Sequence, residues 1–221
     1  MNRQALRAAA RKRLDDIVQP YGWPDDELNR WLDEAVREAS LRAGLTVATT
    51  AIPCRAGVAS YSLPYRVRYV LDAWWTRQVS PATPRAPLER VDRDAFEAWA
   101  RPTTNLADPT RYLIAGRTIR LHPTPKDAGY LEMRGRLVPP PMESDDDEPD
   151  ISPYLHEHLV EWVMYQAGLK RDVDYNLPDP LAHEAIFARY FGPRPSELTL
   201  QGWLEYGATD TVRPDGWRYG R

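Results

Sequence analysis

The chain has 221 residues, 43% of them hydrophobic, which is enough apolar material for one or two small domains with buried cores. Its formal net charge of −3 excludes a protein that coats nucleic acid through a generally basic surface, because phosphate neutralisation needs a clustered cationic excess. The one cysteine, Cys54, excludes an internal disulfide and a Cys-based zinc site, and we expect it to be a small core residue.

Residues 1–45 predict an N-terminal helical hairpin. The apolar stripe of the first helix is formed at helical spacing by Leu6, Ala10, Leu14 and Ile17. The basic residues beside this stripe are expected to be solvated rather than bound to DNA. Pro24 and the three acidic residues after it favour the start of a second helix, and Gly44 is placed to end it. This start is charged and helical rather than a signal peptide, and no apolar run is long enough to cross a membrane, so we expect a soluble protein.

Residues 46–140 predict an antiparallel β-domain with one short helix. Short strands are expected over 49–53 and 59–64, with Gly57 in the turn between them. A longer strand follows, rich in β-branched and aromatic side chains, with one face made of Tyr69, Leu71, Ala73 and Trp75. Asp92 is placed to cap a short helix that carries Phe96 and Trp99.

The segment 108–138 predicts a three-stranded β-meander at the centre of this domain. Apolar and polar residues alternate over 118–122 and again over 131–137, which is the period of a half-buried strand. Gly116 lies between 112–114 and 118–121, where a tight hairpin needs a positive φ. We therefore expect three consecutive antiparallel strands in one sheet.

Residues 141–151 are predicted to be an acidic linker. Like charges at this density repel one another and stay solvated. A calcium loop is an alternative, but the segment lacks the glycine and the terminal glutamate of an EF-hand. The carboxylates expected to face solvent or a channel are Glu143, Asp145, Asp146, Asp147, Glu148 and Asp150.

Residues 152–202 predict two C-terminal helices, which would complete a bundle with the first two. Ser152 and Pro153 are expected to cap and start one helix, and Asp179 and Pro180 the other. The segment 203–221 shows no sustained period and cannot bury its own aromatic side chains, so we predict an extended arm that binds another protein. Its candidate partner-binding residues are Trp203, Tyr206, Arg213, Trp217, Arg218, Tyr219 and Arg221.

No catalytic or metal-binding pattern is found in the sequence. His156, His158 and Glu161 lack the zincin spacing, in which two histidines lie one helical turn apart with glutamate after the first. No GxSxG nucleophile elbow and no glycine-rich phosphate loop occurs. We therefore predict a protein that is not an enzyme and that has no cofactor and no metal. A hydrolase remains the alternative only if its site is assembled from scattered residues.

The order of several motifs resembles the head-to-tail adaptor proteins of tailed bacteriophages, including the tail tubular adaptor of short-tailed phages. The motifs are PDDELNRWLDEAVREAS, YSLP, DPTRYLIAGRTIRLHPTP, YLHEHLVEWVMYQAGLKRD and LPDPLAHEAIFARYF. They cover most of the chain. The resemblance implies an α+β fold in which a bundle of two N-terminal and two C-terminal helices carries an inserted small antiparallel β-domain and an extended C-terminal arm.

The resemblance also implies a function in the virion at the head-tail interface. Copies of the chain would form a homo-oligomeric, dodecameric ring beneath the portal protein, joining it to a tail, stopper or nozzle protein. DNA would pass through the channel without specific binding, and no membrane would be involved. The C-terminal arm would bind the portal protein, and the mild negative charge would favour sliding of DNA.

A nucleic-acid-binding module is the other functional class that the sequence leaves open. It would need basic residues gathered on one surface. The candidates, on the polar face of the predicted meander, are Arg117, Arg120, Arg134 and Arg136.

Overall fold

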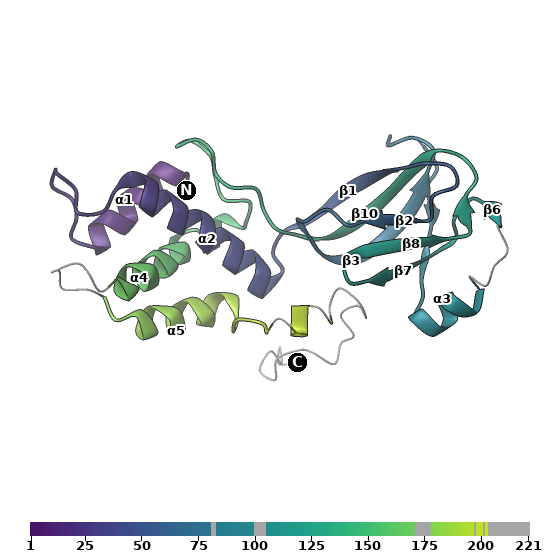
Figure 1. Ribbon diagram of the computed structural model, residues 1–221. Coiled ribbons are helices and arrows are strands. Elements are labelled where there is room, and N and C mark those ends of the chain that lie inside the picture. The colour runs from purple at the N-terminus through teal and green to yellow at the C-terminus, as the bar shows by residue number, and fades with distance from the viewer. Residues whose placement is uncertain (81–82, 100–104, 171–177, 197, 201, 203–221) are drawn as a thin grey trace, which may run out of the picture. The chain divides into compact units, whose positions relative to one another are not determined.

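The computed structural model describes residues 1–80, 83–99, 105–170, 178–196, 198–200 and 202, and it confirms the α+β class (Figure 1). Its helices are α1 (Arg3–Arg13), α2 (Asp25–Ala43), α3 (Arg93–Trp99), α4 (Val160–Leu169) and α5 (Pro180–Phe191), with 3-10 turns η1 (Pro153–Leu155) and η2 (Glu157–Leu159). The longer strands are β1 (Val47–Cys54), β2 (Ser60–Ser62), β3 (Val67–Thr76), β7 (Arg111–Ala115), β8 (Thr118–His122) and β10 (Gly129–Leu137). Two-residue strands are β4 (Ala86–Pro87), β5 (Glu89–Arg90), β6 (Leu106–Ala107) and β9 (Thr124–Pro125).

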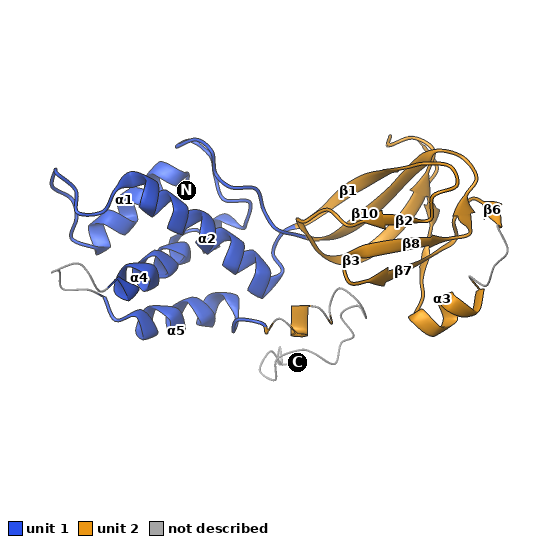
Figure 2. Ribbon diagram, viewed as in Figure 1, with its two compact units in different colours: residues 1–46, 137–195 blue, residues 47–136, 196–221 orange. Residues whose placement is uncertain are grey.

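The chain divides into two compact units (Figure 2). The first, here called the helical unit, combines Met1–Thr46 with Leu137–Pro195 and contains α1, α2, α4 and α5. The second, here called the β unit, contains residues 47–136 with all the longer strands and α3. Within the described ranges, no helix combines the length and apolar character needed to cross a membrane.

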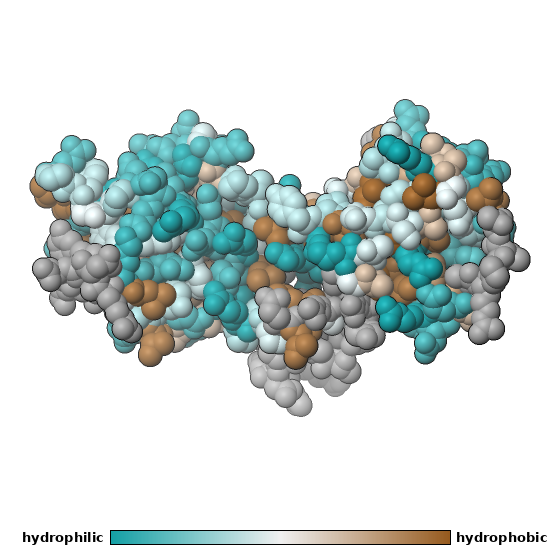
Figure 3. Space-filling view, viewed as in Figure 1, coloured by the Kyte–Doolittle hydropathy of each residue, from teal (hydrophilic) through white to brown (hydrophobic). Residues whose placement is uncertain are grey.

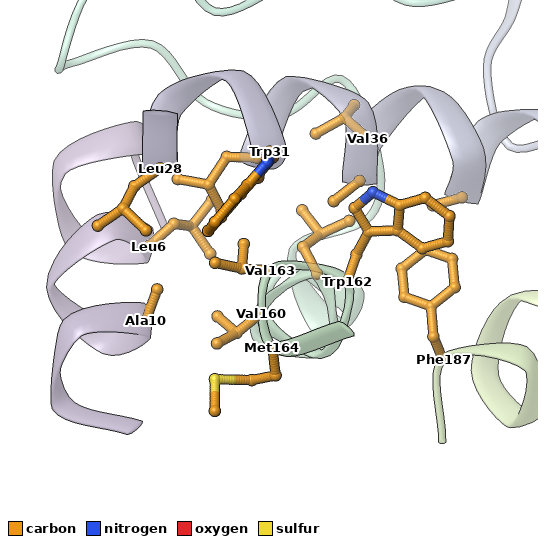
Figure 4. Packing of buried hydrophobic residues seen from close by; sticks show 14 of the residues in the cluster. Leu6, Ala10, Leu28, Trp31, Val36, Val160, Trp162, Val163, Met164 and Phe187 are labelled. Atoms are coloured by element: carbon orange, nitrogen blue, oxygen red, sulfur yellow. The ribbon is translucent and has the colours of Figure 1, made fainter. Parts of the chain in front are cut away.

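Helix α4 lies at the centre of the helical unit, packed between α1, α2 and α5 (Figure 4). It is apolar nearly all round, as expected of a helix that other helices cover. Its Val160, Val163 and Ala167 are at most 1% exposed. Trp162 contacts Phe187 of α5, with ring centroids 5.2 Å apart. The core therefore joins helices from both ends of the chain.

The helical hairpin agrees with the sequence at α2 and differs at α1. Gly44 takes the left-handed conformation (φ 60°), and its backbone N–H donates to the Ser40 carbonyl, which ends α2 as predicted. Helix α1 ends at Arg13, because Asp15 turns the chain away with a φ of 54°. The predicted stripe is therefore wrong at Ile17, which lies in the loop between α1 and α2 and is 63% exposed.

The two C-terminal helices begin in different ways. Asp179 caps α5 by accepting a hydrogen bond from the Leu181 N–H, and Pro180 occupies the first turn, as predicted. The prediction for Ser152 is wrong, because its side chain makes no capping hydrogen bond. Instead the chain passes through η1 and η2 before the α-helix begins at Val160.

Within its described residues, the β unit contains two four-stranded sheets, ordered β1-β10-β3-β4 and β2-β8-β7-β5, and a two-stranded pair of β6 and β9. The pairs β1–β10, β2–β8, β3–β4 and β7–β8 are antiparallel, whereas β5–β7 and β6–β9 are parallel. The β7–β8 hairpin turns at Gly116 with a φ of 56°, as predicted. The predicted three-stranded meander is wrong, because β10 belongs to the other sheet, between β1 and β3.

Strand burial departs from simple alternation at several positions. In β3, Ala73 and Trp75 are buried, but Leu71, predicted on the same face, is 39% exposed. In β10, Glu132 is 2% exposed although its position is polar in the pattern, and Arg85 lies 2.9 Å from its carboxylate. Cys54 is buried, in agreement with the sequence.

Several aromatic side chains are buried within their own unit and are not available for contacts with other molecules. Four of the eight tryptophans are at most 4% exposed within their own unit, namely Trp23, Trp31, Trp75 and Trp162. Among the described residues, the aromatic side chains that remain exposed include Tyr65 (76% exposed) and Tyr154 (91% exposed).

Candidate interaction surfaces

The acidic segment 141–151 is attached to the helical unit by its backbone. The N–H of Arg3 donates to the Asp147 carbonyl (2.8 Å), and the N–H of Gln4 donates to the Asp145 carbonyl (3.1 Å). Met142 is 5% exposed in the helical core, and its N–H donates to the Asp33 carboxylate. The segment is therefore packed on α1 and α2 and is not a free linker.

Asp145 makes the main side-chain contact of this segment. Arg7 donates to both of its carboxylate oxygens, at 2.9 and 2.8 Å, and Arg3 donates at 3.1 Å. These contacts, led by the hydrogen bond from Arg7, lower the pKa of Asp145 to about 2. The expectation of solvated arginines is thus wrong for Arg3 and Arg7, and the carboxylate of Asp145 is held by both of them.

Asp147 stabilises a turn within the same segment. Its carboxylate accepts hydrogen bonds from the N–H groups of Glu143 and Ser144 and from the Ser144 hydroxyl, at 2.7 to 2.8 Å. The backbone hydrogen bond from Ser144 is the main reason that the pKa of Asp147 is lowered. The acidic side chains of the segment that remain on the exposed surface are Glu143, Asp146, Glu148 and Asp150.

Arg11 fixes the loop between α1 and α2. It is 6% exposed and donates to Asp16, to the Trp23 carbonyl and to Asp25, at 2.5 to 2.8 Å. Asp16 in turn accepts hydrogen bonds from the backbone N–H groups of Gly22 and Trp23. Arg11, on the charged side of α1, therefore stabilises the loop, whereas the sequence analysis predicted that the basic residues of this helix are solvated.

His156, His158 and Glu161, which the sequence analysis considered as a metal site, each contact a different group. His156 is 1% exposed, and its Nε2 lies 3.1 Å from the Ile151 carbonyl oxygen. His158 stacks on Tyr190, with ring centroids 3.4 Å apart. Within the described part of the chain, no group of three or more His, Cys, Asp or Glu side chains is placed to hold a metal ion.

Glu161 of α4 instead links α1 to α5. Arg13 donates to its two carboxylate oxygens at 2.5 and 3.1 Å, and His183 Nδ1 lies 2.7 Å from Oε2. Burial raises the pKa of Glu161, but the hydrogen bonds from Arg13 and His183 outweigh burial and lower it overall. Sequence reasoning missed this cluster because its members are up to 170 positions apart.

The four arginines of the proposed nucleic-acid face do not share one sheet. Arg117 and Arg120 lie in or beside the β7–β8 hairpin, whereas Arg134 and Arg136 lie in β10. Arg117 donates to three backbone carbonyls, and Arg120 pairs with Glu97 at 2.6 Å. Arg134 lies 3.8 Å from Asp72, and Arg136 lies 6.0 Å over the Tyr69 ring. The four arginines therefore do not form one continuous basic surface, and each already contacts another group of the β unit.

A pocket of about 380 Å³ lies in the β unit, where β5 and the start of α3 meet β7. Its lining consists of Arg90, Val91, Asp92, Arg93, Leu113, Ile114 and Ala115. Asp92 caps α3, because its carboxylate accepts a hydrogen bond from the Ala95 N–H at 2.7 Å. Among the described residues, the lining contains no histidine, cysteine or serine that could act as a nucleophile or proton carrier.

The predicted C-terminal arm, 203–221, lies outside the described residues, so its seven candidate binding residues are untested. The described ranges contain an acidic segment held on the helical unit, and a β unit. A family model described as SU10 adaptor protein matches residues 1–212. The chain therefore belongs to the SU10 adaptor protein family. A search of curated proteins gives no match.

Family membership makes the protein a structural adaptor of a bacteriophage and a component of the virion. It also confirms the resemblance drawn from the sequence motifs.

Proposed function

We propose that the chain is the subunit of a head-to-tail adaptor ring, which joins the portal protein to the tail and leaves a channel for DNA. The observation that carries this proposal is the adaptor family match over residues 1–212. By resemblance, the ring is dodecameric, and its second partner is a tail, stopper or nozzle protein. The helices of the ring subunit form a bundle into which the β unit is inserted.

Passage of DNA through the ring is supported by the distribution of charge. The chain is mildly acidic, with a net charge of −3. The segment fixed by Asp145 presents Glu143, Asp146, Glu148 and Asp150 on its surface. Carboxylates repel phosphates, so a segment of this kind next to the channel favours sliding of DNA. We propose that these four carboxylates face the channel or the solvent.

Attachment to the portal protein is assigned to the arm 203–221. Its tryptophans, tyrosines and arginines are the residue types that most often supply binding energy at protein interfaces.

The test compares the full chain with a variant that lacks 207–221, each mixed with purified portal rings and viewed by electron microscopy. The full chain is expected to add a layer beneath the portal, and the truncated chain is expected to remain a folded protein that does not bind. Normal assembly of the truncated chain would remove the arm from the proposal. No added layer with the full chain would remove the adaptor ring itself.

The nucleic-acid alternative gains no support from the four arginines, because each is engaged by another group of the β unit. A gel-shift assay at moderate salt separates the two functions. The adaptor is expected to leave DNA unshifted, and a salt-resistant shift would favour the alternative.

A further inference from the structure

Among the described residues, the outer surface of α5 is mostly apolar and exposed. Its exposed residues are Leu181, Ala182, Ala185, Ile186, Arg189 and Tyr190, of which only Arg189 is charged. Leu181 is 78% exposed. Figure 3 shows hydrophobic residues over α5, and hydrophilic residues prevail over α2. A helix with apolar residues on its inner and outer sides is normally covered on both, so this surface, here called the α5 surface, is suited to a partner.

The loop between α1 and α2 also exposes apolar side chains. Ile17 is 63% exposed and Val18 is 75% exposed, and Tyr21 follows with 39%. The Arg11 guanidinium lies 3.7 Å over the Tyr21 ring. Together with the hydrogen bonds around Asp16, this contact holds the loop in one conformation. A loop that is already ordered loses little conformational entropy on binding, so its exposed aliphatic side chains are a favourable contact.

We propose that the α5 surface of one copy binds the α1–α2 loop of a second copy. This inference rests on the proposed ring, since a ring joins two different surfaces of each subunit, whereas pairing of α5 with itself would stop at a dimer. The helical unit supplies two such surfaces. Their charges are opposite, because Asp15 is exposed on the loop and Arg189 is exposed on α5.

Other exposed hydrophobic side chains of the helical unit do not gather in the same way. Tyr154 in η1 and Leu169 at the end of α4 are each the single large exposed hydrophobic residue of their element. Scattered single residues of this kind are normal on protein surfaces. They therefore supply controls for the experiment.

The experiment is disulfide cross-linking of full-length chains with cysteine introduced by Val18→Cys and Ile186→Cys. The wild-type chain is the blank, because its one thiol, Cys54, is 3% exposed. Oxidation of the double variant is expected to give a ladder of dimers, trimers and larger species in a denaturing gel. A mixture of the two single variants is expected to stop at a dimer, and each single variant alone is expected to stay monomeric. Val18→Cys combined with Tyr154→Cys is the matched control and should give no ladder.

A second measurement uses Ile186→Glu, which places a charge on the α5 surface without disturbing the core. Self-association, followed by light scattering with and without portal rings, is expected to weaken by on the order of tenfold or more, because the lost contact buries an aliphatic side chain. Tyr154→Glu should leave it unchanged.

Three results would overturn the inference. One is a dimer from Ile186→Cys alone, which means that α5 packs on α5. Another is that the double variant forms a ring by electron microscopy but gives no ladder on oxidation. This result would leave the proposed function intact. The third is a chain that forms no oligomer alone or with portal rings, and this removes the proposed function as well.

Discussion

Glu161 provides the sharpest test of how the helical unit is held together. Glu161→Gln keeps the size of the side chain and removes its charge, so that Arg13 and His183 lose the carboxylate that they share. The residue is 8% exposed, and solvent cannot fully replace the lost contacts. Glu157, one turn earlier and exposed, is the matched control position.

The expected loss is about 2.5 to 4 kcal/mol of unfolding free energy for the helical unit. The Arg13 side chain is 38% exposed, so screening limits its share to about 1 kcal/mol. The His183 side chain is 16% exposed, and a hydrogen bond to a charged group is worth about 1.5 to 3 kcal/mol. For a unit of about 100 residues, this corresponds to a decrease in melting temperature of roughly 10 to 20 °C.

The assay is differential scanning calorimetry at several pH values, in which the transition of the helical unit is followed. Because the pKa of Glu161 is lowered in the folded state, its contribution is present above the ordinary carboxyl pKa and is lost as the pH falls through the folded pKa. The difference between wild type and Glu161→Gln should therefore shrink in acid. A variant within about 0.5 kcal/mol of Glu157→Gln at neutral pH would refute the reasoning.

Three further predictions concern the core, a strand contact and the acidic segment. Phe187→Ala, at a position that is 0% exposed, should cost about 3 to 5 kcal/mol in urea unfolding of the helical unit. Gly135→Ala would place its Cβ 2.1 Å from the Tyr69 carbonyl oxygen, so the β unit should lose about 1 to 3 kcal/mol by thermal unfolding. Asp145→Asn should reduce the stability of the helical unit at neutral pH. The pKa of Asp145 is lowered from 3.8 to about 2, so the difference from wild type should disappear as the pH approaches 2.

Each of these predictions has a control or a contrary outcome. Gly202→Ala should leave the thermal stability of the protein unchanged, because a Cβ there meets nothing within 4 Å. A Phe187→Ala variant with wild-type stability would mean that α5 does not pack on Trp162. If Asp145→Asn has the same stability profile as wild type from pH 2 to 7, the contacts to Arg3 and Arg7 do not hold the segment.

Local signals in the sequence predicted the elements that depend on local chemistry. The end of α2 at Gly44, the cap of α5 at Asp179 and the hairpin at Gly116 each follow from a backbone requirement that one residue type meets. The strand 67–76 was also found at its observed bounds, since a run of β-branched and aromatic residues favours no other structure.

Contacts between distant residues were not visible in the same signals. The pairing of Asp145 with Arg7 spans 138 positions, and a run of acidic residues is equally typical of a solvated linker. Alternation in β10 gives a strand but not its neighbours, so β10 was placed beside β8 instead of between β1 and β3. Glu132 is buried because Arg85 lies beside it, and periodicity carries no information about such a partner.

The most direct test of the central claim is an electron cryomicroscopy reconstruction of the full chain assembled on portal rings. The proposed function predicts a closed ring beneath the portal, with the exposed carboxylates of the acidic segment facing the channel or the solvent and the α5 surface covered by the α1–α2 loop of the neighbouring copy. A portal that stays bare, or a ring in which those carboxylates are buried against the arginines of another subunit, would contradict it.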